Sequence, residues 1–324
     1  MRLVNKVREK FMSKQVCKHP YAPFDFNFYI DTDISFPQTY HRQEEFEDRL
    51  ALDRREIFKY TPYIRGLCNI CGLQSAFFCK NLIHPRDFLT CMHCGSTSRY
   101  RSVARGVLRA LSELSGVHVA SMAAVQYVQF PRIIKVYDTQ VAFSLGVVTY
   151  PLPHYLAQNP NIELFLSDLN SVTNDKGPNG EYISQQNLES LSYDSNKFDI
   201  VITSDVMEHV RQPQRAHGEI ARVVRPGGVY IFTVPHTRDQ YETQCRVKIN
   251  NPADPSQDEY LEEKVYHGDP NSGDAALVYQ IFGRDIDDQL NALGFDVSYC
   301  NEDFLGCGIL GSELFYCRKR VTAV

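Results

Sequence analysis

Residues 198–234 restrict the fold more than any other part of the sequence. They read FDIVITS, a polar turn, a helical pattern over residues 213–224, the breaker RPGG and then the apolar run VYIFTV. A short β-branched run, a helix and a second such run are typical of the strand–helix–strand unit of a parallel sheet. Proline ends the helix because it has no N–H to donate, and glycine accepts the positive φ of the chain reversal. The segment therefore predicts an open α/β sheet.

Further runs of the same kind lie on both sides of this unit. The sequence predicts strands over residues 133–137, 162–166, 200–203 and 229–234. It also predicts a helix over residues 286–293, closed by a glycine. After that helix, the segments 295–300 and 314–318 are joined by a glycine-rich connection. These two segments suit an antiparallel hairpin at the edge of the sheet.

Two CxxC pairs precede the predicted sheet. The first pair is Cys68 and Cys71, the second is Cys91 and Cys94, and a glycine follows each pair. Each pair forms a knuckle whose thiolates point to one centre, and two knuckles complete the tetrahedral sulfur shell that Zn²⁺ prefers. Coincidental buried cysteines and separate redox dithiols are weaker interpretations, because two spaced pairs gain more from sharing a metal. The pattern predicts a small zinc ribbon whose main role is structural.

A helical pattern over residues 98–114 follows the second pair. Val103, Val107 and Leu111 recur at helical spacing, and we expect the arginines of this segment on other faces of the helix. The helix is expected to pack the ribbon onto the sheet. Residues 61–112 carry seven Lys and Arg against one Asp. This charge keeps nucleic-acid binding open as a hypothesis, although four thiolates on one Zn²⁺ leave a net negative charge that nearby cations offset.

Charge is distributed unevenly along the 324 residues. The first 112 residues carry 18 Lys and Arg against 11 Asp and Glu, whereas the rest carries 16 against 28. The acidic majority argues against a nucleic-acid enzyme, because phosphate contacts require positive charge. The basic start MRLVNKVREK has no apolar run after it, and no stretch approaches the roughly 20 apolar residues of a membrane span. We therefore expect a cytoplasmic protein with reduced thiols and no membrane span.

The sequence of residues 187–236 is similar to that of a known protein family. FDIVITSDVMEHV and AHGEIARVVRPGGVYIFTVPH resemble the core of class I S-adenosylmethionine-dependent methyltransferases of the ubiquinone-biosynthesis type. The resemblance implies an α/β fold, namely a Rossmann-like seven-stranded methyltransferase sheet with an antiparallel last strand, here preceded by a small zinc ribbon. The expected domains are an N-terminal extension over residues 1–60, the ribbon and connecting helix over 61–115, and the methyltransferase domain over 116–324, with an insertion at about 237–280.

The same resemblance implies S-adenosyl-L-methionine as the cofactor, bound where the strands end. In this family the second strand ends in an acid that accepts from the ribose hydroxyls, and a later segment recognises the adenine. The family's glycine-rich loop after the first strand is missing, because KVYDTQVAFSLG has its first glycine only at Gly146. The implied cofactor-binding residues are Asp138, Asp168 for the ribose, Asn187 and Leu188 for the adenine, Ser204 and Asp205.

Candidate catalytic residues come from the chemistry of methyl transfer. Transfer from a sulfonium is an in-line displacement, so positioning supplies most of the catalysis, and a base is needed only for a hydroxyl or similar acceptor. His267 and Asp269 lie in YHGDP, in the segment where this fold usually builds its acceptor pocket, and Asp269 would orient the imidazole. His209 and His236 are further candidate bases.

The layout of a ribbon followed by this domain is also similar to bacterial-type zinc-ribbon methyltransferases often associated with glycan or secondary-metabolite modification. The resemblance therefore implies a small-molecule or glycan-type acceptor. Two other hypotheses stay open. One is an RNA methyltransferase whose zinc ribbon reads RNA. The other is a non-catalytic interaction protein on a methyltransferase scaffold, which the missing glycine loop motivates and which fold alone does not exclude.

Overall fold

The computed structural model describes residues 63–80, 84–139, 151–169, 180–268 and 275–321. The chain divides into the units Met1–Phe36 and Pro37–Val324, and every described residue belongs to the second. The extension expected over residues 1–60 lies outside the described residues, as does most of the segment that follows Asp138. Among the helices of the described ranges, none is long and apolar enough to cross a membrane.

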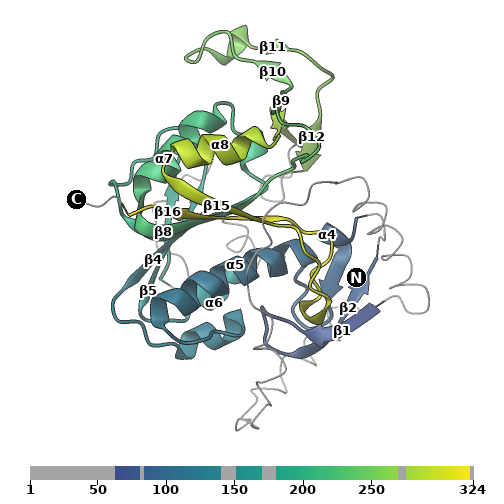
Figure 1. Ribbon diagram of the computed structural model, residues 1–324, viewed down its shortest axis with the longest axis vertical. Coiled ribbons are helices and arrows are strands. Elements are labelled where there is room, and N and C mark those ends of the chain that lie inside the picture. Colours follow the sequence, from purple (N-terminus) through teal and green to yellow (C-terminus); the bar gives the residue numbers. More distant parts are fainter. Residues whose placement is uncertain (1–62, 81–83, 140–150, 170–179, 269–274, 322–324) are drawn as a thin grey trace. The chain divides into compact units, whose positions relative to one another are not determined.

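A seven-stranded sheet runs through the second unit (Figure 1) in the order β15-β16-β8-β7-β4-β5-β6. Only β16 runs antiparallel to its two neighbours, and the other adjacent pairs are parallel. The predicted seven-stranded sheet with an antiparallel last strand is confirmed. Its strands are β4 (Ile134–Asp138), β5 (Ile162–Asp168), β6 (Tyr182–Gln185), β7 (Phe198–Ser204), β8 (Val224–Thr233), β15 (Phe295–Cys300) and β16 (Leu314–Lys319).

Helices cover both faces of this sheet. Figure 1 shows α5 and α6 on one face and α7 and α8 on the other. All seven residues of β7 are buried, as expected for a central parallel strand that is covered on both faces. The helices and short 3₁₀ turns here are α5 (Ser98–Ser115), α6 (Leu152–Ala157), α7 (Pro213–Val223), α8 (Asp285–Ala292), η1 (Met122–Tyr127) and η2 (Met207–His209).

The predicted helix boundaries are close to the observed ones. Helix α5 begins after Thr97, whose side chain accepts a hydrogen bond from the Tyr100 N–H, and it ends at Gly116 with a φ of 73°. Helix α7 ends at Val223, one residue before its predicted end and two residues before Arg225, where the RPGG stretch begins. That stretch lies within the bounds of β8, where the pairing with β7 shifts register, and Gly227 there has a φ of 78°.

The N-terminal part of the described chain is a small ribbon. It consists of β1 (Tyr63–Leu67), β2 (Gln74–Cys79), α4 (Pro85–Phe88) and β3 (Leu89–Cys91), and its three strands pair antiparallel in the order β1-β2-β3. Gly72 and Gly95, which follow the two cysteine pairs, have φ values of 72° and 71°. These left-handed turns are the conformation that the cysteine knuckles require.

The segment between β8 and α8 contains residues 237–280, which the sequence predicted to be an insertion. Its described residues form short antiparallel pairs, β10 with β11, β12 with β13 and β14 with β9. The elements are β9 (Gln244–Cys245), β10 (Val247–Lys248), η3 (Pro255–Gln257), β11 (Glu259–Tyr260), β12 (Tyr266–Gly268), β13 (Ala275–Leu277) and β14 (Gln280–Ile281). The turn η4 (Leu305–Cys307) lies between β15 and β16.

The sequence did not predict the burial of an arginine on α5. Arg101 lies on another face than the apolar stripe, as expected, but it is 0% exposed. Its Nη2 donates to the carbonyl oxygens of Leu89 at 2.9 Å and Gly308 at 2.6 Å, and its guanidinium lies 4.5 Å from the centroid of the Phe77 ring. Helical periodicity located the face that packs on the sheet, whereas the ribbon covers a second face of the same helix. A buried cation thus joins the ribbon to the connection between β15 and β16.

Candidate functional site

The four cysteines of the two CxxC pairs meet at one point. Their Sγ atoms all lie within 4.8 Å of one another, with 3.8 Å between Cys68 and Cys94 and 4.0 Å between Cys71 and Cys91. A tetrahedral site with Zn–S bonds of about 2.3 Å places its sulfur atoms about 3.8 Å apart. The predicted cluster of Cys68, Cys71, Cys91 and Cys94 is therefore confirmed, and its donor set and spacing fit Zn²⁺.

Polar groups surround the four sulfur atoms. Ser75 Oγ lies 3.1 Å from Cys91 Sγ, and Cys94 Sγ donates to Ser96 Oγ at 3.1 Å. Polar groups next to metal ligands orient those ligands. Burial lowers the pKa of Arg101 while the nearby thiolates oppose that shift, so this guanidinium is a local counter-charge to the sulfur shell. The centre has the features of a structural metal site.

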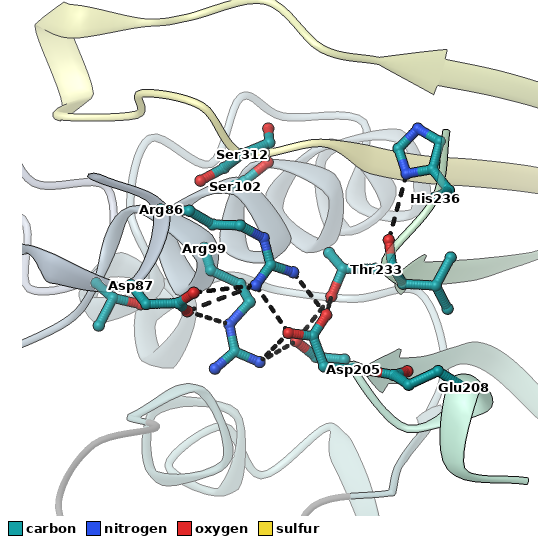
Figure 2. A network of polar contacts seen from close by, with 12 residues as sticks. Arg86, Asp87, Arg99, Ser102, Asp205, Glu208, Thr233, His236 and Ser312 are labelled. Atoms are coloured by element: carbon teal, nitrogen blue, oxygen red, sulfur yellow. Dashed lines mark hydrogen bonds and ion pairs between the residues drawn. The ribbon is translucent and has the colours of Figure 1, made fainter. Parts of the chain in front are cut away.

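A second polar cluster lies at the carboxyl ends of β7 and β8 (Figure 2). Ser204 is the last residue of β7, and Asp205 follows it with a φ of 51°. The Asp205 N–H donates to the carbonyl oxygen of Thr233 at 2.9 Å, and its carboxylate accepts from the Thr233 hydroxyl at 2.8 Å. The Thr233 hydroxyl also lies 3.0 Å from Ser204 Oγ. These contacts tie the ends of the two strands together.

Two arginines converge on the same carboxylate, as Figure 2 shows. Arg86 on α4 donates to Asp205 through Nη1 at 2.8 Å and Nη2 at 2.6 Å. Arg99 on α5 places Nη1 2.9 Å from Asp205, and its Nε donates to Asp87 at 3.0 Å. Burial by itself raises the pKa of Asp205, but the charges of the two arginines outweigh it and hold this pKa below its ordinary range. Asp205 is therefore a carboxylate at neutral pH.

Glu208 and His209 follow in the turn η2. Glu208 is 0% exposed, and burial, helped by the charge of Asp205, raises its pKa to about 8. His209 Nδ1 lies 2.8 Å from the carbonyl oxygen of Leu277, which assigns the proton to Nδ1 and the lone pair to Nε2. Nε2 lies 3.7 Å from Glu208 Oε1. A carboxyl group that is protonated at neutral pH and an imidazole of fixed tautomer thus stand side by side.

His236, the further candidate base, lies beyond the end of β8. Its Nε2 lies 2.7 Å from the Tyr299 hydroxyl and its Nδ1 lies 3.2 Å from the Val234 carbonyl oxygen. Burial lowers the pKa of His236 to about 4. The imidazole is therefore neutral at physiological pH and is held in place by its tyrosine partner.

The sheet register brings several expected cofactor residues to one edge. Asp138 ends β4 and Asp168 ends β5, and these strands are neighbours, with β7 and its last residue Ser204 on the other side of β4. The backbone of Asp138 is level with Leu166 and Ile202. Asp138 is 0% exposed, whereas the side chain of Asp168 lies outside the described part. Ligands of open α/β sheets bind at this edge.

Asn187 and Leu188 follow β6, the strand next to β5. The side-chain oxygen of Asn187 accepts from the Glu189 N–H at 2.9 Å, and Leu188 is 8% exposed. Both residues therefore lie beyond the carboxyl end of β6. Their contact with a nucleoside stays a prediction.

The candidate catalytic residues His267 and Asp269 lie largely outside the described part of the chain. His267 lies on β12, level with Ala276 of β13, and its side chain is outside the described part of the chain, as is the whole of Asp269. The hairpin that carries His267 nevertheless adjoins the strand ends, because Leu277, the last residue of β13, contacts His209 and the Tyr279 N–H donates to the Glu208 carbonyl oxygen at 2.8 Å. The insertion therefore borders the polar cluster at the ends of β7 and β8.

Sequence patterns missed Arg86 and Arg99. Arg86 and Asp205 are separated by 119 residues, and neither arginine belongs to a recognised motif. The excess of basic residues over residues 61–112 is a signal that could have pointed to acidic partners elsewhere in the chain. It did not indicate which acids they are.

Residues 140–232 match the family model described as a methyltransferase domain. This stretch of the chain is therefore similar to methyltransferase domains. Over 48 residues the chain is also 38% identical to ubiquinone biosynthesis O-methyltransferases from several strains of Coxiella burnetii, which covers 15% of this chain and 20% of the relatives. The chain thus spans about a fifth of the length of the curated relatives that it matches. The family match includes β5, β6, β7 and α7, the elements that lead to the strand-end cluster.

Solved methyltransferase structures resemble the domain at low sequence identity. One is a putative S-adenosylmethionine-dependent methyltransferase from Listeria monocytogenes, with 13% identity, a TM-score of 0.39 and coverage of 67% of this chain and 100% of that one. Another is the 1,6-didemethyltoxoflavin-N1-methyltransferase of Burkholderia thailandensis with bound 1,6-didemethyltoxoflavin and S-adenosylhomocysteine, with 14% identity, a TM-score of 0.37 and coverage of 69% and 85%. The fold assignment rests on the strand order and the family match of this chain.

Proposed function

We propose that the protein is an S-adenosyl-L-methionine-dependent methyltransferase that acts on a small-molecule or glycan-type acceptor. The observation that carries the proposal is the common edge formed by Asp138, Asp168 and Ser204 at the ends of β4, β5 and β7. This edge is where open α/β sheets bind nucleotide-like ligands. It lies in and next to the segment that matches the methyltransferase family.

The residues at this edge suit the donor. Thr139 follows Asp138, and its Oγ1 is buried without a hydrogen-bond partner among the described residues. A buried hydroxyl of this kind favours a ligand that satisfies it. Asp168 would accept from the ribose hydroxyls and Asn187 would accept from the adenine amino group. When bound, the donor supplies an electrophilic methyl group on a sulfonium.

Proton transfer would fall to the groups beside the acceptor. His209 presents Nε2 as the basic nitrogen, because its Nδ1 is held by the Leu277 carbonyl oxygen, and His267 with Asp269 is the other candidate on the adjoining hairpin. A histidine base suits an acceptor with a hydroxyl group, whose proton must leave as the methyl group arrives. Glu208, whose pKa is raised to about 8, would hold a proton next to His209 at neutral pH.

We further propose that Cys68, Cys71, Cys91 and Cys94 hold one structural Zn²⁺, which suits a reducing compartment such as the cytoplasm. The contacts of the ribbon favour this role over RNA reading. Arg86 and Arg99 are engaged by carboxylates, and Arg101 is buried among carbonyl oxygens. Less positive charge therefore remains for phosphate groups than the sequence count suggested.

Calorimetric titration of the full chain with S-adenosylmethionine or S-adenosylhomocysteine tests the proposal. We expect binding by the wild type and about ten- to a hundredfold weaker binding by Asp168→Ala, because charge-assisted hydrogen bonds to the ribose are lost. Asp194→Ala, a change of an exposed aspartate between β6 and β7, is the matched control and should bind as the wild type does. No binding by the wild type at millimolar donor would favour the non-catalytic scaffold instead.

A further inference from the structure

We propose that Arg86 and Arg99 are positioning residues that couple metal binding by the ribbon to donor binding at the strand ends. The inference rests on the proposed function, since it concerns the same donor edge. Its basis is the clamp on Asp205, by which we mean the contacts of Arg86 and Arg99 with that carboxylate. The clamp joins the ribbon directly to the end of β7.

The clamp has the geometry of a strong ion pair. Arg86 uses both Nη atoms on the two carboxylate oxygens at 2.8 and 2.6 Å, the bidentate arrangement that restricts both partners most. The side chains of Arg86 and Asp205 are each 20% exposed, so bulk water screens the pair only in part. Arg99 adds a second guanidinium at 2.9 Å. Such a site fixes the position of the carboxylate.

Both arginines depend on the second cysteine pair for their position. Arg86 precedes Cys91 by five residues, and Arg99 follows Cys94 by five. Arg86 lies on α4, a helix of four residues, which is too short to be stable without its surroundings. Its neighbour β3 ends at Cys91, whose N–H donates to the carbonyl oxygen of Ser96 within the knuckle at 2.9 Å. A metal bound by these sulfur atoms would hold both arginines in position to contact Asp205.

At its other end the clamp restrains the backbone of the donor edge. Asp205 adopts a φ of 51°, a left-handed conformation that costs free energy in a residue other than glycine and persists where surrounding contacts impose it. Arg99 Nη1 also lies 3.5 Å from the Ser204 hydroxyl. The turn that follows carries Glu208 and His209. Release of the carboxylate would therefore loosen the segment that begins at Ser204.

Donor affinity of the metal-loaded full chain is the first measurement. We expect Arg86→Met to bind S-adenosylhomocysteine about tenfold more weakly than the wild type, because the restraint on Asp205 is lost. Arg65→Met is the matched control, since Arg65 lies on β1 of the same ribbon and is exposed, and its affinity should match the wild type. Arg86→Lys should restore part of the loss, because lysine keeps the charge but not the bidentate geometry.

Combined substitutions, and zinc removal from the variants, test whether metal binding and donor binding are coupled. Asp205→Asn removes the clamp without touching the ribbon, and the double variant Arg86→Met/Asp205→Asn should bind no more weakly than the weaker single variant. Removal of zinc should weaken donor binding by the wild type. It should cause a smaller further loss of donor affinity in Arg86→Met, where the contact of Arg86 with Asp205 is already absent. Equal affinities for Arg86→Met and Arg65→Met, or full additivity in the double variant, would overturn the inference alone. Failure of the wild type to bind any donor would overturn the proposed function as well.

Discussion

His217 provides a quantitative prediction about stability. It lies on α7, is 0% exposed, and neither ring nitrogen has a hydrogen-bond partner within the described residues. The rings of Tyr230, Phe232 and Phe282 surround it at centroid distances of 5.9, 5.8 and 6.2 Å. Burial lowers the pKa of this imidazole to about 3. The folded protein therefore holds His217 neutral well below the pH at which a histidine in the unfolded chain takes up a proton.

The sign of the pH effect follows from the lowered pKa. Below the unfolded pKa of about 6.5 the unfolded chain binds a proton that the folded chain excludes, so the free energy of unfolding falls as the pH falls toward 3. The slope approaches about 1.4 kcal/mol per pH unit, which amounts to about 2 kcal/mol between pH 7.5 and pH 5. His217→Leu abolishes this contribution, and near neutral pH it should cost little, because an unpartnered polar group is replaced by an apolar one.

Urea unfolding followed by circular dichroism at several pH values, with zinc held constant, measures the effect. The difference in free energy of unfolding between His217→Leu and the wild type should shift by about 2 kcal/mol in favour of the variant from pH 7.5 to pH 5. His118→Leu is the control, since His118 is exposed, and its difference from the wild type should stay constant with pH. A constant difference for His217→Leu would show that the imidazole has a partner or contacts water, and the reasoning would fail.

Three further predictions concern the ribbon and the insertion. Cys91→Ser should lose the bound zinc and melt at lower temperature, whereas Cys245→Ser, a change of an exposed cysteine outside the cluster, should keep one zinc per chain by metal analysis. Arg101→Met should lower the free energy of unfolding by about 3 kcal/mol or more in urea titrations, because it leaves several buried carbonyl oxygens without a donor. A loss below about 1 kcal/mol would show that Arg101 does not stabilise the contact between the ribbon and the connection from β15 to β16. His267→Ala and Asp269→Ala should each lower turnover about a hundredfold and leave donor affinity unchanged, and weakened donor binding would move this segment to the donor side.

Local patterns predicted the parts of the structure that depend on local geometry. The spacing of Cys68, Cys71, Cys91 and Cys94 predicted their meeting point, because each knuckle is a short turn that directs its own sulfur atoms. The alternation of β-branched runs and helices predicted the sheet, since strands and helices are set by periods of a few residues. The strand β6, which reads YISQ, was not predicted, because four residues with one buried side chain carry little periodic signal.

The same sequence patterns did not predict contacts between segments that lie far apart in the chain. Helical spacing placed Val103 and Val107 correctly against the sheet, but it contained no information about the ribbon that buries Arg101 on another face. Asp205 was singled out by its position after β7, while its partners Arg86 and Arg99 belong to elements more than a hundred residues earlier. Long-range ion pairs depend on the folded arrangement of elements, which residue spacing within one element does not encode.

In the proposed function the donor binds at the carboxyl ends of β4, β5 and β7. Photochemical cross-linking of isotopically labelled S-adenosylmethionine to the full chain, followed by digestion and peptide mapping, locates the bound donor. We expect label on peptides that contain Asp138 and Thr139 or Ser204 to His209, with labelling suppressed by excess S-adenosylhomocysteine. Label confined to peptides of the ribbon or of the hairpin β10-β11, or no competed label at all, would contradict this proposal.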